Sequence, residues 1–237
     1  MWHVQADHLD KPNTGRGRRG WSVAALLTLP LVDGKKKRLI LKRQQNYFSR
    51  SLRHPFRGAP TFEKEFSNLL RCKRLGISVP EPVYYAKRQV TEGIQVILIT
   101  EYLEQYTPLD KLESVRKKQG RSGRAERNKL IDAIANLART LHQHSMAHNC
   151  LYPKHFFIQQ LDDKMQACLI DLEKSKWSPF GNRRRIRDLE TLYRRSKGWT
   201  HTDRLRFLNT YHGLEHLDKK AKHLCRQILE RNKKKSG

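Results

Sequence analysis

Apolar residues in the first hundred positions fall into short runs separated by turn signals, a pattern typical of β-strands. The run 21-WSVAALLTLPLV-32 is rich in β-branched and aromatic residues, and 38-RLILKRQ-44 follows it after the turn pair Asp33-Gly34. The two runs therefore predict an antiparallel hairpin. Two further strands are expected over residues 77–89 and 94–103.

Elsewhere the apolar positions recur every three or four residues, as they do on one face of an α-helix. The first such helix is expected over residues 62–75, with Thr61 as its cap and Gly76 as its stop. Its predicted inward face consists of Phe62, Phe66, Leu69 and Leu70. The clearest helix is expected over residues 129–145, where the repeating apolar residues are Leu130, Ile134, Leu137, Ala138 and Leu141.

The remaining segments are shorter or more polar. Residues 46–60 are basic and are expected to form a loop, and the polar stretch 114–128 is expected to be a loop or a helix edge. The runs 156-FFIQQ-160 and 166-QACLID-171 predict a second hairpin that turns at Asp162-Asp163. Helical patterns return over residues 185–196, 203–214 and 216–232.

This order of elements predicts an α+β fold with two lobes. Residues 1–104 would form a small β-rich N-lobe with one helix, and residues 105–237 a mainly helical C-lobe that contains the second hairpin. A chain of 237 residues is long enough for two small lobes that together make one domain.

Charge changes this picture by pointing to an anionic partner. The chain has 49 Lys and Arg against 23 Asp and Glu, a net charge of +26, which favours nucleic acid, an anionic membrane surface or a phosphorylated substrate. A nucleic-acid-binding module is disfavoured, because the basic residues are dispersed and aromatic residues make up only 8% of the chain.

Other features of the composition concern the cellular compartment. The four cysteines form no CxxC pair, so we expect reduced thiols in a cytoplasmic protein and no zinc site. The N-terminus has no apolar core of a secretory signal, and no run approaches the roughly 18 apolar residues of a membrane span.

Three charged residues arrive in the order that a kinase-type cleft requires. Lys42 lies near the end of a strand, Glu65 follows on the first helix, and Asp171 closes the second hairpin. A strand lysine that holds nucleotide phosphates needs a helix carboxylate to orient it. A carboxylate at the mouth of a hairpin suits Mg²⁺, which takes few protein carboxylates and completes its shell with phosphate oxygens and water. Each residue alone has a plainer reading as a solvated or turn residue, so the hypothesis rests on their order.

The segment 15-GRGRRG-20 matches the pattern GxGxxG. A dinucleotide-binding loop would need a strand before it and a helix after it, whereas here a polar segment precedes it and a strand pattern follows. We expect Gly15, Gly17 and Gly20 to form a glycine loop that covers phosphates, and a flexible basic arm is the alternative.

Four stretches of the chain carry a resemblance to a known family. They are 40-ILKRQQNYFSRSLRHPFRGAPTFEKEF-66, GISVPEP at 76–82, 148-HNCLYPKHFFI-158 and 169-LIDLEKSK-176. Together they resemble the InaA family of the lipopolysaccharide kinase superfamily, which contains the Kdo and heptose (WaaP-type) kinases. The resemblance implies a protein-kinase-like fold, ATP and Mg²⁺ as cofactors, and phosphorylation of inner-core lipopolysaccharide sugars. It also implies the cytoplasm of a Gram-negative bacterium, and the basic charge fits peripheral contact with the inner membrane.

The resemblance also assigns roles by position. Lys42 matches the phosphate-binding lysine and Glu65 its partner, while Asp171 matches the metal-binding aspartate. His155 falls where protein kinases place a metal-binding asparagine and where heptose kinases have a histidine. The linker from Glu101 to Leu103 matches the segment whose backbone contacts adenine.

The catalytic loop departs from the family at one position. Heptose kinases have an aspartate two residues after the loop histidine, where this chain has Cys150. His148 is expected to brace the loop, and Arg187-Asp188-Leu189 resembles a structural RDL motif. Loss of the acid removes general-base assistance, typically worth about 10²–10⁴-fold, although phosphoryl transfer depends mainly on positioning and charge.

Two functions therefore stay open. The first is a kinase that phosphorylates a sugar hydroxyl of the lipopolysaccharide core or of a related anionic glycolipid. The second is a pseudokinase of the InaA type, active in the stress response, in which Cys150 has replaced the acid.

We also expect the Cys150 thiol to ionise more readily than usual, because many cations surround it in the sequence.

Overall fold

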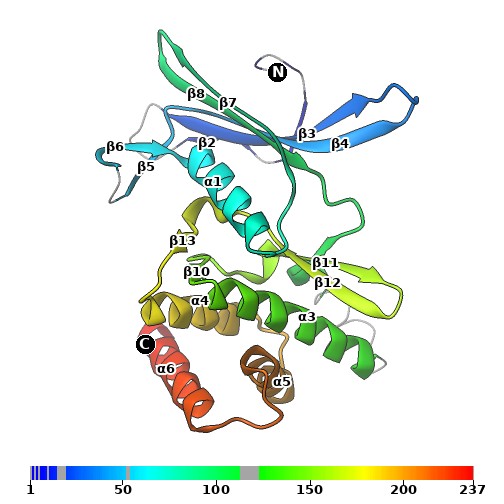
Figure 1. Ribbon diagram of the computed structural model, residues 1–237, viewed down its shortest axis with the longest axis vertical. Coiled ribbons are helices and arrows are strands. Elements are labelled where there is room, and N and C mark those ends of the chain that lie inside the picture. The colour runs from blue at the N-terminus through cyan, green and yellow to red at the C-terminus, as the bar shows by residue number, and fades with distance from the viewer. Residues whose placement is uncertain are drawn as a thin grey trace. The chain divides into compact units, whose positions relative to one another are not determined.

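The computed structural model describes residues 2, 4, 6–9, 11–14, 20–51, 54–112 and 123–236 (Figure 1). The proposed loop glycines Gly15 and Gly17 lie outside these residues, and Gly20 lies within them. The chain divides into two compact units. Unit 1 comprises Met1–Arg71 and Pro80–Glu104, and unit 2 comprises Cys72–Val79 and Gln105–Gly237.

Unit 1 is built on an antiparallel sheet. Its strands are β1 (Asp7–His8), β2 (Asn13–Thr14), β3 (Trp21–Pro30), β4 (Lys36–Gln45), β7 (Pro82–Val90) and β8 (Gly93–Glu101). They are arranged in the order β1-β3-β4-β8-β7, with β2 also paired to β3. The predicted hairpin is confirmed: Ala25 lies opposite Leu41, and Gly34 takes the left-handed conformation, φ 77°, in the turn.

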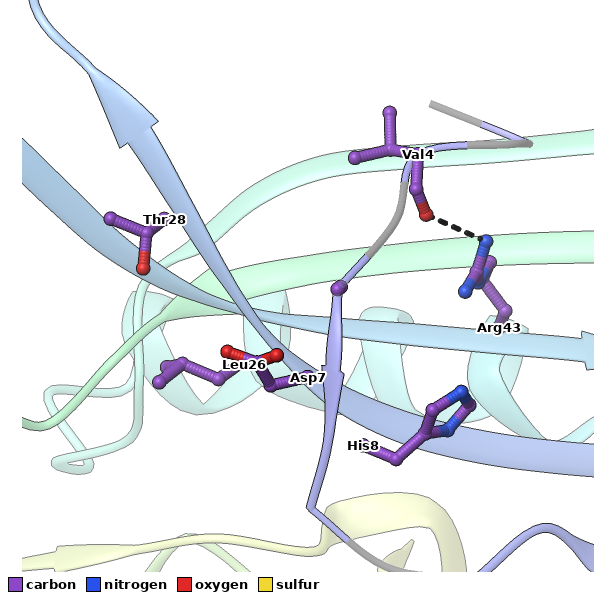
Figure 2. A pocket seen from close by; sticks show the side chains of 7 residues that line it. Val4, Asp7, His8, Leu26, Thr28 and Arg43 are labelled. Atoms are coloured by element: carbon purple, nitrogen blue, oxygen red, sulfur yellow. Dashed lines mark hydrogen bonds between the residues drawn. The ribbon is translucent and has the colours of Figure 1, made fainter.

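One face of this sheet is apolar and is covered by the N-terminal segment. Its core residues are Leu27, Leu39, Leu41, Ile97 and Ile99, against which Trp2, Val4, Ala6 and Leu29 pack. Arg43 ties the segment down by donating hydrogen bonds of 3.2 Å to the carbonyl oxygens of Trp2 and Val4. A pocket with a volume of about 640 Å³ lies at this place. Arg43 and His8 are among the residues that line it (Figure 2). None of the predicted site residues that the structure describes lines it.

Helix α1 (Thr61–Arg74) belongs to the opposite face of the sheet. The side-chain oxygen of Gln44 accepts hydrogen bonds of 2.9 Å from the Thr61 hydroxyl and from the backbone N–H of Phe62. The prediction that Thr61 caps the helix with its own side chain is therefore wrong, because Gln44 of the neighbouring strand does so. The predicted stop is confirmed at Gly76, φ 67°. Leu70 departs from the predicted inward face and is 39% exposed.

The expected loop over residues 46–60 is instead largely a hairpin. Strand β5 (Phe48–Ser51) pairs with β6 (His54–Pro60). Apolar periodicity does not reveal this hairpin, because backbone hydrogen bonds define the pairing and the sequences FSRS and HPFRGAP do not alternate between apolar and polar residues. Lys64 of α1 secures it by donating to the Ser49 carbonyl oxygen at 2.5 Å.

Unit 2 is mainly helical. Its helices are α3 (Arg124–Gln143), α4 (Asn182–Arg195), α5 (His201–His212) and α6 (Lys219–Ser236). Its strands are β9 (Thr107–Pro108), β10 (Met146–Ala147), β11 (Phe156–Leu161), β12 (Lys164–Leu169) and β13 (Lys176–Trp177). The predicted second hairpin is confirmed as the antiparallel pair β11–β12. Within the described part of the chain, no helix is long and apolar enough to cross a membrane.

The predicted apolar face of α3 is buried throughout, which confirms the helical reading of this segment. The helix starts five residues before the expected start at residue 129, inside the stretch for which the sequence predicts a loop or a helix edge. An ion pair explains part of this extension, because Arg127 contacts Asp203 of α5 at 2.6 Å. A polar helical turn can be held by such a tertiary contact even though it lacks apolar periodicity.

Candidate functional site

The predicted pair of Lys42 and Glu65 is formed in unit 1. Strand alternation turns Leu41 into the apolar face and leaves Lys42 on the α1 face, where Glu65 projects from the helix. Lys42 Nζ lies 2.6 Å from Glu65 Oε1, and the two side chains are only 19% and 4% exposed. Lys42 also lies over the ring of Phe62, 5.7 Å from its centroid. The pair therefore holds an ammonium group in a fixed, largely dry position.

In unit 2, the loop that begins at His148 is anchored by a buried aspartate of α4. Asp188 is 0% exposed and accepts a 2.7 Å hydrogen bond from the backbone N–H of His148. Asp188 Oδ2 also lies 3.3 Å from His142 Nε2 of α3. The sequence singled out Arg187-Asp188-Leu189 as a structural motif, but the partner of Asp188 becomes apparent only in the fold.

His148 itself is fully buried and faces the loop backbone. Its Nε2 forms a 2.9 Å hydrogen bond with the carbonyl oxygen of Ile170, which can only accept, so Nε2 carries the proton. Its ring stacks on that of His155 at a centroid distance of 5.5 Å. This burial favours the bracing role over contact with a substrate.

Cys150 is half-buried in the same loop. Burial raises the pKa of its thiol, and this effect outweighs the opposing effect of the positive charges of Lys174 and Arg187. The expectation that surrounding cations would favour the thiolate is therefore wrong, because the sequence shows the cations but not the loss of water. Cys150 is a neutral thiol at physiological pH.

His155 and Asp171, the two residues that the resemblance assigns to metal binding, lie side by side, with 3.2 Å between Nε2 and Oδ2. His155 Nδ1 donates a 2.8 Å hydrogen bond to the Cys150 carbonyl oxygen, so in the neutral ring Nε2 carries a lone pair. Burial lowers the pKa of His155 to about 4, although the charge of Asp171 opposes the shift. The neutral ring thus turns an acceptor toward a carboxylate, an arrangement that a cation between the two would stabilise.

The donor set suits a metal that is shared with another ligand. No group of three or more potential metal-ligating His, Cys, Asp or Glu side chains occurs among the described residues. One carboxylate and one imidazole would leave most of a coordination shell to water and phosphate oxygens, which is how Mg²⁺ is commonly bound beside nucleotides. The residues present therefore fit a divalent metal that arrives with a phosphate ligand.

The other predicted nucleotide contacts receive less support. The backbone N–H of Glu101 already donates to the Glu81 carbonyl oxygen at 2.8 Å, and its carboxylate pairs with Lys37 at 3.3 Å. Leu103 lies two residues beyond the end of β8. At Gly20 an added Cβ would lie 2.3 Å from the backbone oxygen of Asn46. Close packing of the chain explains this glycine without a phosphate.

Comparisons with known proteins agree with this architecture. A solved structure described as WaaP in complex with acyl carrier protein has a TM-score of 0.68 and 20% identity, over 98% of this chain and 88% of that chain. At this identity the likeness establishes the fold, and it confirms the predicted α+β, protein-kinase-like class. No curated protein sequence matches significantly.

The family model for the lipopolysaccharide kinase (Kdo/WaaP) family matches residues 1–211. The match confirms the superfamily that the sequence motifs indicated, whereas the InaA subfamily stays a prediction. Of the expected function, the kinase-like activity and the relation to lipopolysaccharide are properties of this family. Since the match spans most of the 237 residues, the chain belongs to the lipopolysaccharide kinase (Kdo/WaaP) family.

Proposed function

We propose that the protein transfers the γ-phosphoryl group of ATP, with Mg²⁺, to a sugar hydroxyl of the lipopolysaccharide core or of a related anionic glycolipid. The observation that carries the proposal is the pair of facing acceptors, His155 Nε2 and Asp171 Oδ2, 3.2 Å apart. In a member of a kinase family, such a pair is best explained as a metal site. The ion pair of Lys42 with Glu65 gives independent support.

Each side chain would have a defined task. Glu65 fixes the ammonium group of Lys42, which binds a phosphate oxygen of the nucleotide. Asp171 and His155 would hold the metal, and when bound it would offset negative charge on the transferred phosphoryl group. Asp188 positions the loop by fixing the backbone of His148. These tasks concern positioning and charge, which dominate phosphoryl transfer.

The test is transfer of label from γ-labelled ATP to purified lipopolysaccharide core that lacks phosphate. Transfer of label to the glycolipid supports the kinase proposal. Binding of Mg²⁺-ATP without transfer would instead identify the pseudokinase that Cys150 suggests. A protein that neither binds the nucleotide nor transfers label would contradict both readings.

Cys150→Asp is expected to raise the rate of transfer by up to about 10²-fold, because it supplies the missing acceptor-activating carboxylate. Burial raises the pKa of the Cys150 thiol in the natural protein. The thiol therefore keeps its proton and cannot accept one from the substrate hydroxyl. Initial rates at saturating Mg²⁺-ATP measure the effect. Cys150→Ser is the control, which removes the thiol without adding a base. A lower rate in the aspartate variant, with nucleotide affinity unchanged, would show that the cysteine itself serves the reaction.

A second proposal concerns a partner of unit 2. A pocket of about 220 Å³ between α4, α5 and α6 has a largely apolar lining that includes Leu192, Leu208 and Ile228. Arg204 adds a cationic guanidinium group to it, and His201 adds an imidazole ring. The similar WaaP structure contains acyl carrier protein, and we propose that this pocket receives an acyl chain presented by such a carrier. An apolar chain fits the lining, and an anionic group of the carrier fits the guanidinium group of Arg204.

Leu229→Trp is expected to weaken binding of acylated carrier protein by about tenfold or more. Leu229 lines the pocket and is 43% exposed, so a larger ring can occupy the opening without disturbing the core. Calorimetric titration with acylated and unacylated carrier measures the effect. Val83→Trp, a similar enlargement at an exposed site of β7 in unit 1, is the control. Equal affinity of the Leu229 variant and the natural protein would exclude this pocket.

A further inference from the structure

Two large aromatic side chains of unit 2 are held out in solvent by an ordered turn. Phe180 is 99% exposed and Trp177 is 58% exposed. The turn between them is closed by a 3.0 Å hydrogen bond from the Gly181 N–H to the Ser178 carbonyl oxygen, and Ser178 N–H donates to the Ser145 carbonyl oxygen at 2.7 Å. The backbone therefore fixes both rings at the surface, where water contact with their apolar area is unfavourable.

The sequence around this turn is strongly basic. Residues 174–187 contain no Asp or Glu, and their cationic residues are Lys174, Lys176, Arg183, Arg184, Arg185 and Arg187. Among the described residues, no carboxylate forms an ion pair with Lys176, Arg183 or Arg184. Arg183 and Arg184 also lie in the first turn of α4, where the helix dipole disfavours positive charge. In the part of the chain that the structure describes, these three cations are therefore not stabilised by an ion pair.

We propose that Trp177, Phe180, Lys176, Arg183 and Arg184, here called the aromatic–arginine surface, dock the protein on an anionic lipid bilayer. Aromatic rings, tryptophan above all, favour the boundary between headgroups and acyl chains, and each basic residue near an anionic leaflet strengthens binding. The surface combines both requirements within a short stretch of the chain.

A polar hollow beside the turn fits the same partner. It has a volume of about 390 Å³ and is lined by Ser145, Ser178, Asn182 and Arg185, among others. Hydroxyl, amide and guanidinium groups are suitable partners for the phosphate of a lipid headgroup. Phe180 is also among the residues that line it, so the apolar and polar parts of one lipid can be contacted together.

The exposed rings favour a bilayer over nucleic acid. Single-stranded nucleic acid is usually bound in a groove whose aromatic side chains offer flat faces for successive bases. Phe180 instead protrudes from a tight turn with nearly its whole surface in water, a geometry suited to insertion. The adjacent Pro179 is also exposed and extends the apolar tip.

The test is co-sedimentation of the full chain with vesicles of phosphatidylcholine alone or mixed with phosphatidylglycerol, in the absence of ATP. Vesicle binding is thus measured separately from phosphotransfer, so the two proposals can fail independently. The natural protein is expected to bind only the anionic vesicles, and more weakly at high salt. The double variant Trp177→Ser, Phe180→Ser is expected to lose about tenfold or more in affinity, and Arg183→Gln, Arg184→Gln about 30-fold.

Two controls carry the same chemical changes elsewhere in unit 2. Leu161→Ser removes an exposed apolar side chain beside the acidic turn Asp162-Asp163, and Lys219→Gln, Lys220→Gln removes two exposed cations from the first turn of α6. Both are expected to bind as the natural protein does. Equal losses in controls and variants, binding to neutral vesicles, or binding to an RNA homopolymer in place of vesicles would overturn the proposal. All variants change exposed or partly exposed groups, and thermal melting verifies that each is folded.

Discussion

Asp171→Asn is expected to lower the rate of phosphotransfer by about 10²–10³-fold, because a preorganised charge at the reacting phosphoryl group is lost. The same variant should bind Mg²⁺-ATP more weakly. The anionic Oδ2 of Asp171 faces His155 Nε2. Asparagine would replace this carboxylate with an uncharged amide. Calorimetry with Mg²⁺-ATP measures the binding, and transfer of label to the glycolipid measures the rate.

The backbone dictates the choice of asparagine. Asp171 has φ 60° and ψ 59°, in the left-handed region that Asn and Asp tolerate better than other non-glycine residues. An alanine there would add backbone strain to the loss of the charge. Asp162→Asn is a matched control, since Asp162 also has a positive φ, 46°, in the turn of the β11–β12 hairpin. If Asp171→Asn behaved like this control, the assignment of the metal site would be wrong.

Much of the fold could be predicted because apolar periodicity reports burial directly. The repeating face of α3 and the β3–β4 hairpin follow from side-chain spacing alone. The β5–β6 hairpin could not be found in this way, since backbone pairing defines it. The cap of α1 is equally invisible in the sequence, because Gln44 lies 17 positions before Thr61 and contacts it only after the strand and the helix have packed.

The candidate site was predictable to a similar extent. The order of Lys42 and Glu65 along a strand and a helix anticipated their ion pair, because the two elements must pack to bury their apolar faces. The ionisation of Cys150 was predicted in the wrong direction, since composition counts cations and not the exclusion of water. The facing acceptors at His155 and Asp171 depend on a left-handed backbone at Asp171, which no sequence pattern marks.

The ion pair in unit 1 makes a prediction about stability that separates folding from function. Lys42→Met is expected to lower the free energy of unfolding by about 3–5 kcal/mol, because it leaves the carboxylate of Glu65 buried without its partner. Adding Glu65→Leu should recover most of that loss, since two apolar side chains can pack beside Phe62. Urea denaturation of the natural protein and of the single and double variants measures these differences.

Lys87→Met is the matched control for this pair. Lys87 of β7 forms an ion pair of 3.0 Å with Glu63, which lies on α1 like Glu65, but the two side chains are 43% and 36% exposed. Loss of this exposed ion pair should lower the free energy of unfolding by at most about 1 kcal/mol. Phosphotransfer should remain lost in the stable double variant, because a thioether in place of the Lys42 ammonium group cannot bind a phosphate oxygen. If Lys42→Met were no more destabilising than Lys87→Met, the buried pair would not contribute to the fold. If the double variant transferred phosphate at the natural rate, Lys42 would have no part in the reaction.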